Sequence, residues 1–154
     1  MSSGPGSADR NPLLSRLDVF VGTWREMVSV PDVPVGRMTF EWVLDGQFLL
    51  QRSEIDDPAF PDSLMIIAPD GAGGDGYVQH YFDARGIARI YEMHVDDGEW
   101  TLLREKADFA VLSFQQRFRG IFSDDANTIR GEWQSAREGQ PWERDFEVTY
   151  TRVV

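Results

Sequence analysis

Residues 37–44 read RMTFEWVL, an alternation of polar and apolar side chains that decides the fold class. If this stretch is extended, one face carries the apolar residues Met38, Phe40, Trp42 and Leu44. The opposite face carries charged and hydroxyl side chains. Because successive side chains of a strand point to opposite faces, the pattern predicts a strand with one buried face and one wet face.

The same period of two continues on both sides of this stretch, in ten segments separated by residues that favour turns. The predicted strands are Thr23–Val30, Arg37–Leu44, Phe48–Ile55, Ser63–Ala68, Tyr77–Asp83, Ala88–Val95, Trp100–Glu105, Val111–Phe122, Thr128–Ala136 and Trp142–Val153. Most connections between them are short, as at Asp45-Gly46 and Asp97-Gly98, which favours hairpins.

Ten consecutive hairpin-connected strands tend to curl and close, because closure removes the two exposed edges of the sheet. We therefore predict an all-β protein, a single closed antiparallel up-and-down barrel with a short N-terminal helix. A two-sheet β-sandwich is the alternative, and long crossover connections would favour it.

A chain of 154 residues with 42% apolar residues is long enough for one domain with a substantial core. Residues 1–11 are rich in Ser, Gly and Pro and predict a flexible tail, and residues 12–154 form the barrel domain. Within it, Pro12 to Phe20 places Leu13, Leu17 and Phe20 at helical spacing, so we expect one short helix there.

The net charge of −11 makes phosphate backbones and anionic lipid surfaces poor partners, so neither nucleic acid nor a membrane is expected. No apolar run approaches the roughly 20 residues of a membrane span. The absence of cysteine excludes disulfides and thiolate chemistry. The N-terminus lacks the basic and apolar regions of a secretory signal, and we expect a cytoplasmic protein, with a homodimer left open.

A short helix running into Gly22-Thr23-Trp24 resembles the Gly-x-Trp opening of the calycin superfamily, the lipocalins, fatty-acid-binding proteins and their bacterial relatives. The resemblance is closest to a bacterial family of calycin-like barrels, with support from residues 81–86 and from the terminal Tyr-Thr-Arg. It implies that Arg152 of the last strand lies across Trp24 of the first and closes the barrel seam.

A ten-stranded barrel is wide enough to enclose a cavity, and the chain has ten Phe, five Trp and four Tyr. The period of two places these residues inside: Trp24, Met38, Phe40, Trp42, Phe114, Phe118, Trp133, Phe146, Val148 and Tyr150. They fill a core or line a pocket. The function we predict is binding of a small, largely apolar molecule in the interior.

Polar residues in the same inward alternation are candidates to contact a ligand, because an unpaired buried polar group is costly. Glu26 with Arg104 or Arg144 would hold a ligand carboxylate or phenol, or would form a buried ion pair. The predicted ligand-binding residues are Met38, Phe40, Trp42, Arg104, Phe114, Gln116, Phe118, Trp133, Ser135, Arg144, Phe146 and Tyr150.

The first alternative is an enzyme that uses the same cavity for isomerisation, cyclisation or hydrolysis of an apolar metabolite. Glu26 or His80 would act as general acid–base, with Tyr150 or an arginine orienting a carbonyl group. A further alternative is a non-catalytic interaction domain that assembles through an exposed strand or through the acidic outer face.

Haem is another alternative, because two related calycin branches imply a barrel histidine bound to iron. The alternation leaves the face of His80 open and favours the outer face for His94. The residues after Trp24 lack the glycine-rich opening of those haem barrels, so no cofactor and no metal is predicted.

Two of the longer loops, at residues 31–36 and 56–62, follow alternate strands and so share one end of the predicted barrel. We expect that end to be the mouth, opposite the helix and Trp24.

Overall fold

The computed structural model describes residues 10–71 and 74–154, so the predicted tail lies almost entirely outside the described residues. The elements are α1 (Pro12–Arg16), η1 (Leu17–Phe20, a 3-10 helix), β1 (Gly22–Val28), β2 (Gly36–Val43), β3 (Phe48–Glu54), β4 (Ser63–Pro69), β5 (Tyr77–Asp83), β6 (Ala88–Asp96), β7 (Glu99–Arg104), β8 (Phe114–Phe122), β9 (Thr128–Arg137) and β10 (Glu143–Arg152). Neither helix within these described ranges has the length and apolar character needed to span a membrane.

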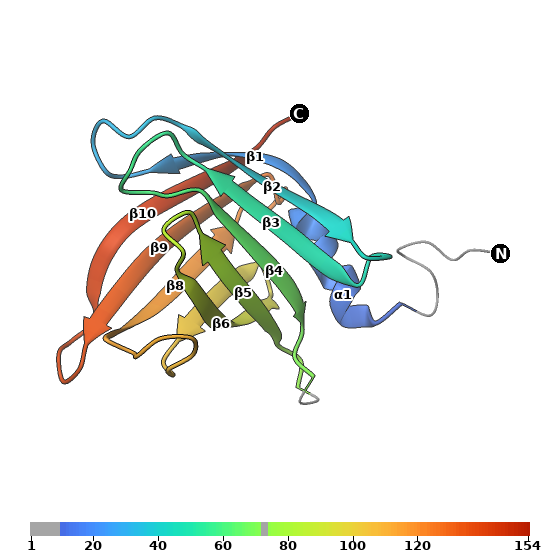
Figure 1. Cartoon of the computed structure of the whole chain (residues 1–154). Helices are drawn as coiled ribbons and strands as arrows, with labels where there is room; N and C mark the ends of the chain where they lie inside the picture. The colour runs from blue at the N-terminus through green and yellow to red at the C-terminus, as the bar shows by residue number, and fades with distance from the viewer. Residues whose placement is uncertain (1–9, 72–73) are drawn as a thin grey trace.

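The strands form one closed antiparallel barrel in which each strand pairs with its neighbours in sequence and β1 pairs with β10 (Figure 1). The prediction of a ten-stranded up-and-down barrel is confirmed, and the sandwich alternative is wrong. Short turns allow this connectivity. Asp97 and Gly98 both adopt positive φ, 49° and 75°, as a tight hairpin turn between β6 and β7 requires.

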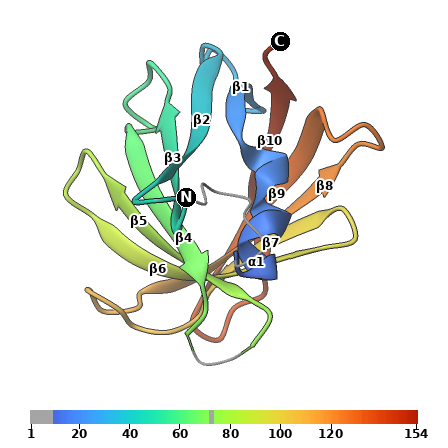
Figure 2. The same cartoon turned by 90° about the vertical axis from the view of Figure 1, so that its right-hand side faces the viewer.

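The N-terminal segment lies across one end of the barrel (Figure 2). It begins with the Asn11 side chain, which accepts a hydrogen bond from the Leu13 amide at 3.0 Å, and with Pro12 in the first turn. The single predicted helix is in fact a short α-helix that tightens into a 3-10 turn. This turn inserts Phe20 into the barrel, where its ring lies 5.0 Å from Phe40 and 4.9 Å from Trp100.

The barrel seam is closed by the pair that the resemblance implied. The Arg152 guanidinium lies 4.2 Å from the centre of the Trp24 ring, and the two residues are partners in the β1–β10 register. Arg152 also donates to the carbonyl oxygens of Val21 and Val19, at 2.8 and 2.6 Å. The same side chain therefore ties the last strand both to the first strand and to the end of the helical segment.

On the inner side of the barrel, the Phe118 ring lies over two glycines that face each other across β8 and β9, Gly120 and Gly131. A Cβ atom at Gly131 would overlap this ring. Glycine is needed at these two positions because the Phe118 ring approaches the backbone closely, and any larger residue would displace this ring from the core.

Strand β8 begins at Phe114, three residues later than the predicted start at Val111. Val111 lies in the β7–β8 loop and is 87% exposed. Asp108 within this loop is tied to the barrel wall, because its carboxylate pairs with Arg104 at the end of β7 at 2.8 Å and accepts from the Ile90 amide of β6 at 2.9 Å.

Candidate ligand-binding site

The half of the barrel opposite the helix encloses a cavity of about 480 Å³. On the side of the closed end, where Phe20 of η1 is inserted, the cavity is lined by Trp100, Leu102 and Phe118. Residues 59–61 of the β3–β4 loop line the mouth. The open end is the end expected from the two longer loops. A volume of this size accommodates a small organic molecule.

Six of the predicted ligand-binding residues line this cavity. They are Phe114, Gln116, Phe118, Trp133, Phe146 and Tyr150. Two rings among them form a continuous aromatic wall with Tyr91, since Trp133 lies 5.2 Å from Phe118 and 5.8 Å from Tyr91. The alternation therefore placed the β8, β9 and β10 aromatic residues on the correct face.

Three residues of β2 point inward but do not line the cavity, which corrects their prediction as ligand contacts. Met38 and Phe40 are buried in the closed half. Trp42 lies under the N-terminal segment, where its indole N–H donates to Asp18 at 3.0 Å. Strand alternation predicts which face of the sheet a side chain is on, but not how far along the barrel axis it lies. These three residues lie toward the closed end, away from the cavity.

Arg144 is on the outer face, so the predicted contact with ligand or with Glu26 is wrong. A β-bulge between Arg144 and Phe146 shifts the register with β9 and reverses the alternation. Arg144 pairs instead with Glu132 on the exposed surface. The extra residue, Asp145, lies at the cavity lining.

Arg104 and Ser135 also do not reach the cavity. Arg104 is 4% exposed, but its Nε and one terminal nitrogen donate to the two carboxylate oxygens of Asp108, at 2.8 and 2.9 Å. Ser135 is half-buried opposite Gln116 in the β8–β9 register and is not part of the lining. The expected pairing of Glu26 with Arg104 is therefore wrong as well.

Glu26 does face the cavity, as its position two residues after Trp24 predicted, and it is 7% exposed. Its carboxylate accepts a hydrogen bond from the Ser53 hydroxyl at 2.5 Å and interacts with the Tyr150 hydroxyl. Burial raises the pKa of Glu26 to about 7, against the opposing effect of these two hydroxyls. Burial also raises the pKa of Tyr150 well above its usual range. Glu26 is thus a carboxyl group that exchanges its proton near neutral pH.

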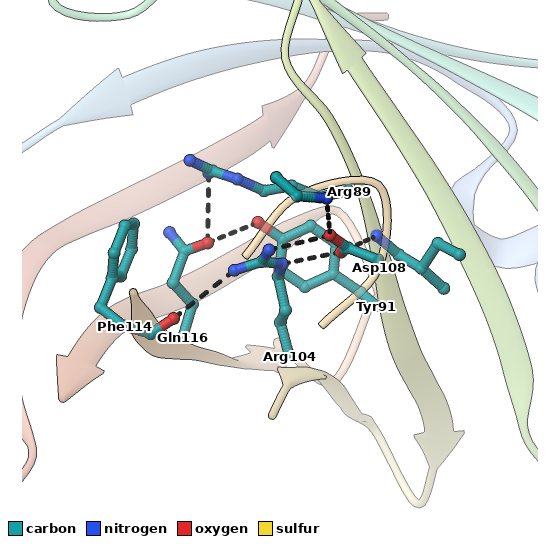
Figure 3. Close-up of polar contacts among 8 residues, drawn as sticks. Arg89, Tyr91, Arg104, Asp108, Phe114 and Gln116 are labelled. Atoms are coloured by element: carbon teal, nitrogen blue, oxygen red, sulfur yellow. Dashed lines mark hydrogen bonds and ion pairs between the residues drawn. The ribbon is translucent and has the colours of Figure 1, made fainter. Parts of the chain in front are cut away.

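A second polar group on the cavity wall joins Arg89, Tyr91 and Gln116 (Figure 3). The Tyr91 hydroxyl donates to the Gln116 side-chain oxygen at 2.8 Å, and Arg89 donates to the same oxygen at 3.2 Å. Behind them lies the Arg104–Asp108 pair, whose carboxylate also accepts from the Ile90 amide at 2.9 Å. The Arg104 guanidinium holds the pKa of Asp108 well below its usual range, so this neighbouring pair is neutral overall.

A third polar contact crosses from β3 to β5. Gln79 donates to the Gln51 side-chain oxygen at 3.0 Å, and Gln51 in turn donates to the Met38 sulfur at 3.2 Å. Both glutamines line the cavity and both are almost fully buried. Aromatic rings therefore give the cavity a largely apolar lining, and three separate sets of hydrogen-bonded polar side chains interrupt it.

Sequence reasoning did not single out Gln51, Gln79, Arg89 or Asp108. The two glutamines had a signal, because each shares its inward alternation with large apolar neighbours on the same strand. Asp108 had none, since it belongs to a loop and acts through a contact that no periodicity predicts.

His80 lies on the outer face of β5, paired with Ile66 and Ile90, while Gln79 and Tyr81 face the cavity. This corrects its selection as a general acid–base in the cavity. His94 is exposed on the outer face of β6. Neither histidine can ligate iron inside the barrel, so the residues present do not fit the haem alternative. In residues 10–71 and 74–154, no three His, Asp or Glu side chains are grouped to hold a metal ion.

No protein-family model and no curated protein matches the chain. Among solved structures, it is similar to the crystal structure of Rv2717c from M. tuberculosis, with 17% sequence identity and a TM-score of 0.61. The match covers 95% of this chain and 100% of that chain. At this identity the likeness concerns the fold alone: the chain folds as a closed β-barrel, an architecture suited to ligand binding in general.

Proposed function

We propose that the protein binds a small, largely apolar molecule in the barrel interior. The supporting observation is the cavity of about 480 Å³, open at one end and walled by aromatic side chains from β6, β8, β9 and β10. The rings offer a large apolar contact area, and the few hydrogen-bonding groups between them would fix the orientation of a ligand. The resemblance to calycin-like barrels, carried by Trp24 and Arg152, supports the same function.

Neighbouring positions on β5 give a matched test, because Gln79 points into the cavity and His80 points away from it. We expect Gln79→Phe to reduce binding of the neutral dye Nile red by tenfold or more, since the added ring occupies the cavity. His80→Phe adds the same ring to the outer face and is expected to leave binding unchanged. Thermal unfolding of both variants checks that each remains folded.

Native mass spectrometry of the protein purified from cells complements the dye test. A bound mass that is retained by the wild type and lost in Gln79→Phe supports the proposal and identifies the ligand. The proposal fails if the wild type binds no dye and retains no molecule, or if both variants bind as the wild type does.

A second candidate function is an enzyme that isomerises, cyclises or hydrolyses an apolar metabolite, with Glu26 as the general acid–base. The observation that favours it is a cavity carboxyl group whose pKa is raised to about 7 by burial, the range suited to proton transfer at neutral pH. The test is deuterium exchange into the molecule found by mass spectrometry, followed by NMR in D₂O. Exchange that the wild type accelerates and Glu26→Gln does not would support isomerisation, whereas equal exchange would exclude Glu26 as the base of an isomerase.

A further inference from the structure

Two of the polar groups of the cavity lie on opposite walls. Glu26 is on β1 and Arg89 is on β6, and these strands are five places apart in either direction around the closed barrel order. Both side chains line the same cavity. A molecule that fills the interior would therefore meet Glu26 on one side and Arg89 on the other.

Arg89 carries a positive charge, and no ion pair between the described residues neutralises it. The ion pairs formed by the described residues include Arg85 and Arg104, but none includes Arg89. Its guanidinium lies 5.5 Å from the centre of the Phe114 ring and 5.9 Å from that of Tyr81, which restrict its movement. Among the described residues its N–H groups donate to the Gln116 side-chain oxygen at 3.2 Å and to the Tyr91 hydroxyl, and neither acceptor carries a charge.

Such a guanidinium is a ready site for a carboxylate, because its planar set of N–H donors matches the two carboxylate oxygens. Gln116 strengthens the site. Its side-chain oxygen already accepts from Arg89 and Tyr91, which leaves its amide N–H groups as further donors at the cavity wall. Arg89 also lies one residue into β6, close to the β5–β6 turn at the mouth, where a charged group stays near water.

The deeper wall offers a different pair of groups. The Trp100 indole nitrogen is buried and has no hydrogen-bond partner among the described residues, although Trp100 lines the cavity. Glu26 lines the same cavity, and Tyr150, which interacts with Glu26, has its ring 6.1 Å from that of Trp100. An unmet indole donor and a carboxylate acceptor in one small space suit a hydroxyl group, which accepts one hydrogen bond and donates another.

Resting on the proposed function, the geometry points to a ligand class: a hydroxylated carboxylic acid with an apolar body. Its carboxylate is held by Arg89 and Gln116 near the mouth, and its hydroxyl lies at the deeper wall with Glu26 and Trp100. The aromatic wall formed by Phe118, Trp133 and Tyr91 covers the apolar body between the two ends.

Three naphthalene probes separate these contributions by isothermal titration calorimetry at pH 8 and 150 mM salt: methyl 2-naphthoate, 2-naphthoic acid and 6-hydroxy-2-naphthoic acid. We expect the wild type to bind 2-naphthoic acid about tenfold more tightly than its neutral ester, as a charge-assisted bidentate contact predicts. The 6-hydroxyl group should add a further several-fold gain.

Variants assign each gain to its residues. Arg89→Gln should abolish the preference for the acid over the ester, whereas Arg119→Gln, on the outer side of β8 and paired with Glu99, should preserve it. Trp100→Phe keeps an aromatic ring, although a smaller one, and removes the N–H group, and it should abolish the gain from the hydroxyl while leaving the gain from the carboxylate.

The comparison of probes on the wild type stands even if a variant fails to fold. Equal binding of acid and ester, or unchanged acid preference in Arg89→Gln, overturns the carboxylate site. No gain from the hydroxyl, or a gain that survives in Trp100→Phe, overturns the deeper site. In either case apolar binding by the ester would leave the proposed function intact, whereas failure of the wild type to bind all three probes and Nile red would remove the proposed function itself.

Discussion

At the closed end of the barrel, Phe20 packs against Phe40, Trp100 and Phe122 with ring centres 4.9 to 5.5 Å apart, whereas at the mouth Phe60 meets the single ring of Phe146 at 5.1 Å. Each end receives a ring from outside the strands, Phe20 from η1 at the closed end and Phe60 from the β3–β4 loop at the mouth. The difference is that Phe20 is fully buried inside the barrel, whereas Phe60 is only half-buried at the rim.

Strand alternation alone therefore does not fill this barrel. A sheet of ten strands encloses more space than its own side chains occupy, and the space remains wherever no other element inserts. Polar groups follow the same division: Glu26, Gln79 and Arg89 lie around the cavity, whereas the packing around Phe20 is aromatic. The comparison teaches that the binding capacity of this protein depends on the asymmetry between a plugged end and an unplugged one.

Truncating Phe20, the side chain that fills the closed end, tests the difference between the two ends most strongly. Phe20 is fully buried, so Phe20→Ala should lower the free energy of unfolding by about 3–5 kcal/mol through lost burial and an unfilled cavity. Phe60→Ala at the mouth should lower it by only about 1 kcal/mol, because Phe60 is partly exposed. Urea denaturation of both variants measures the difference, and equal losses would contradict the division into two halves.

The buried carboxyl group of the open half predicts a pH dependence. The unfolded chain releases the Glu26 proton near pH 4.5, whereas burial keeps it bound in the folded protein until about pH 7. The folded state thus holds more protons between these values, and this contribution to stability declines as pH rises through that window and is lost above it. The decline amounts to up to about 3 kcal/mol.

Glu26→Gln lacks this titration and provides the control. The free energy of unfolding of the variant, relative to the wild type, should rise between pH 4.5 and pH 8 and then level off. Subtracting the two curves removes groups that titrate identically in both proteins. A pH-independent difference would show that Glu26 is not protonated by burial.

At the boundary between the halves, Gly131→Ala should destabilise the protein by about 2 kcal/mol, because the new methyl group overlaps the Phe118 ring. The displaced ring should also weaken Nile red binding, since Phe118 lines the cavity. Gly71→Ala is the matched control, as nothing lies within 4 Å of the position its Cβ would occupy. Unchanged stability and dye binding in Gly131→Ala would mean that Phe118 has free space around it.

The seam of the closed end gives the smallest expected effect. Arg152→Lys keeps the charge but loses the planar fork that bonds Val19 and Val21, and it should cost about 1 kcal/mol. Arg144→Lys, on the same strand but on the exposed face, serves as the comparison. Chemical denaturation measures the free energy of unfolding of both variants. Equal losses would refute the stabilising role of the Arg152 hydrogen bonds.

Much of this architecture was predictable because it depends on local periodicity. The alternation in residues 37–44 and in the other segments identified the strands, their number and most of their inward faces, and short turns such as Asp97-Gly98 favoured an up-and-down order. The inward positions of Glu26, Phe118 and Tyr150 followed from the same rule.

The failures have specific physical causes. The bulge at Asp145 turned Arg144 outward, and periodicity cannot detect one extra residue in a strand. The Val78–Phe82 segment has large side chains on both faces, so only the pairing of β5 with β4 and β6 places His80 outside and Gln79 inside.

The sequence by itself determined that the chain is an all-β barrel with an aromatic interior, since a period of two and a cluster of turn residues act over a few neighbouring residues. Only the tertiary structure decided where that interior is empty. The height of each side chain along the barrel, the insertion of Phe20 at one end and the pairing of Arg104 with Asp108 all depend on contacts between distant segments. Those contacts leave Glu26 and Arg89 facing the same cavity from opposite walls.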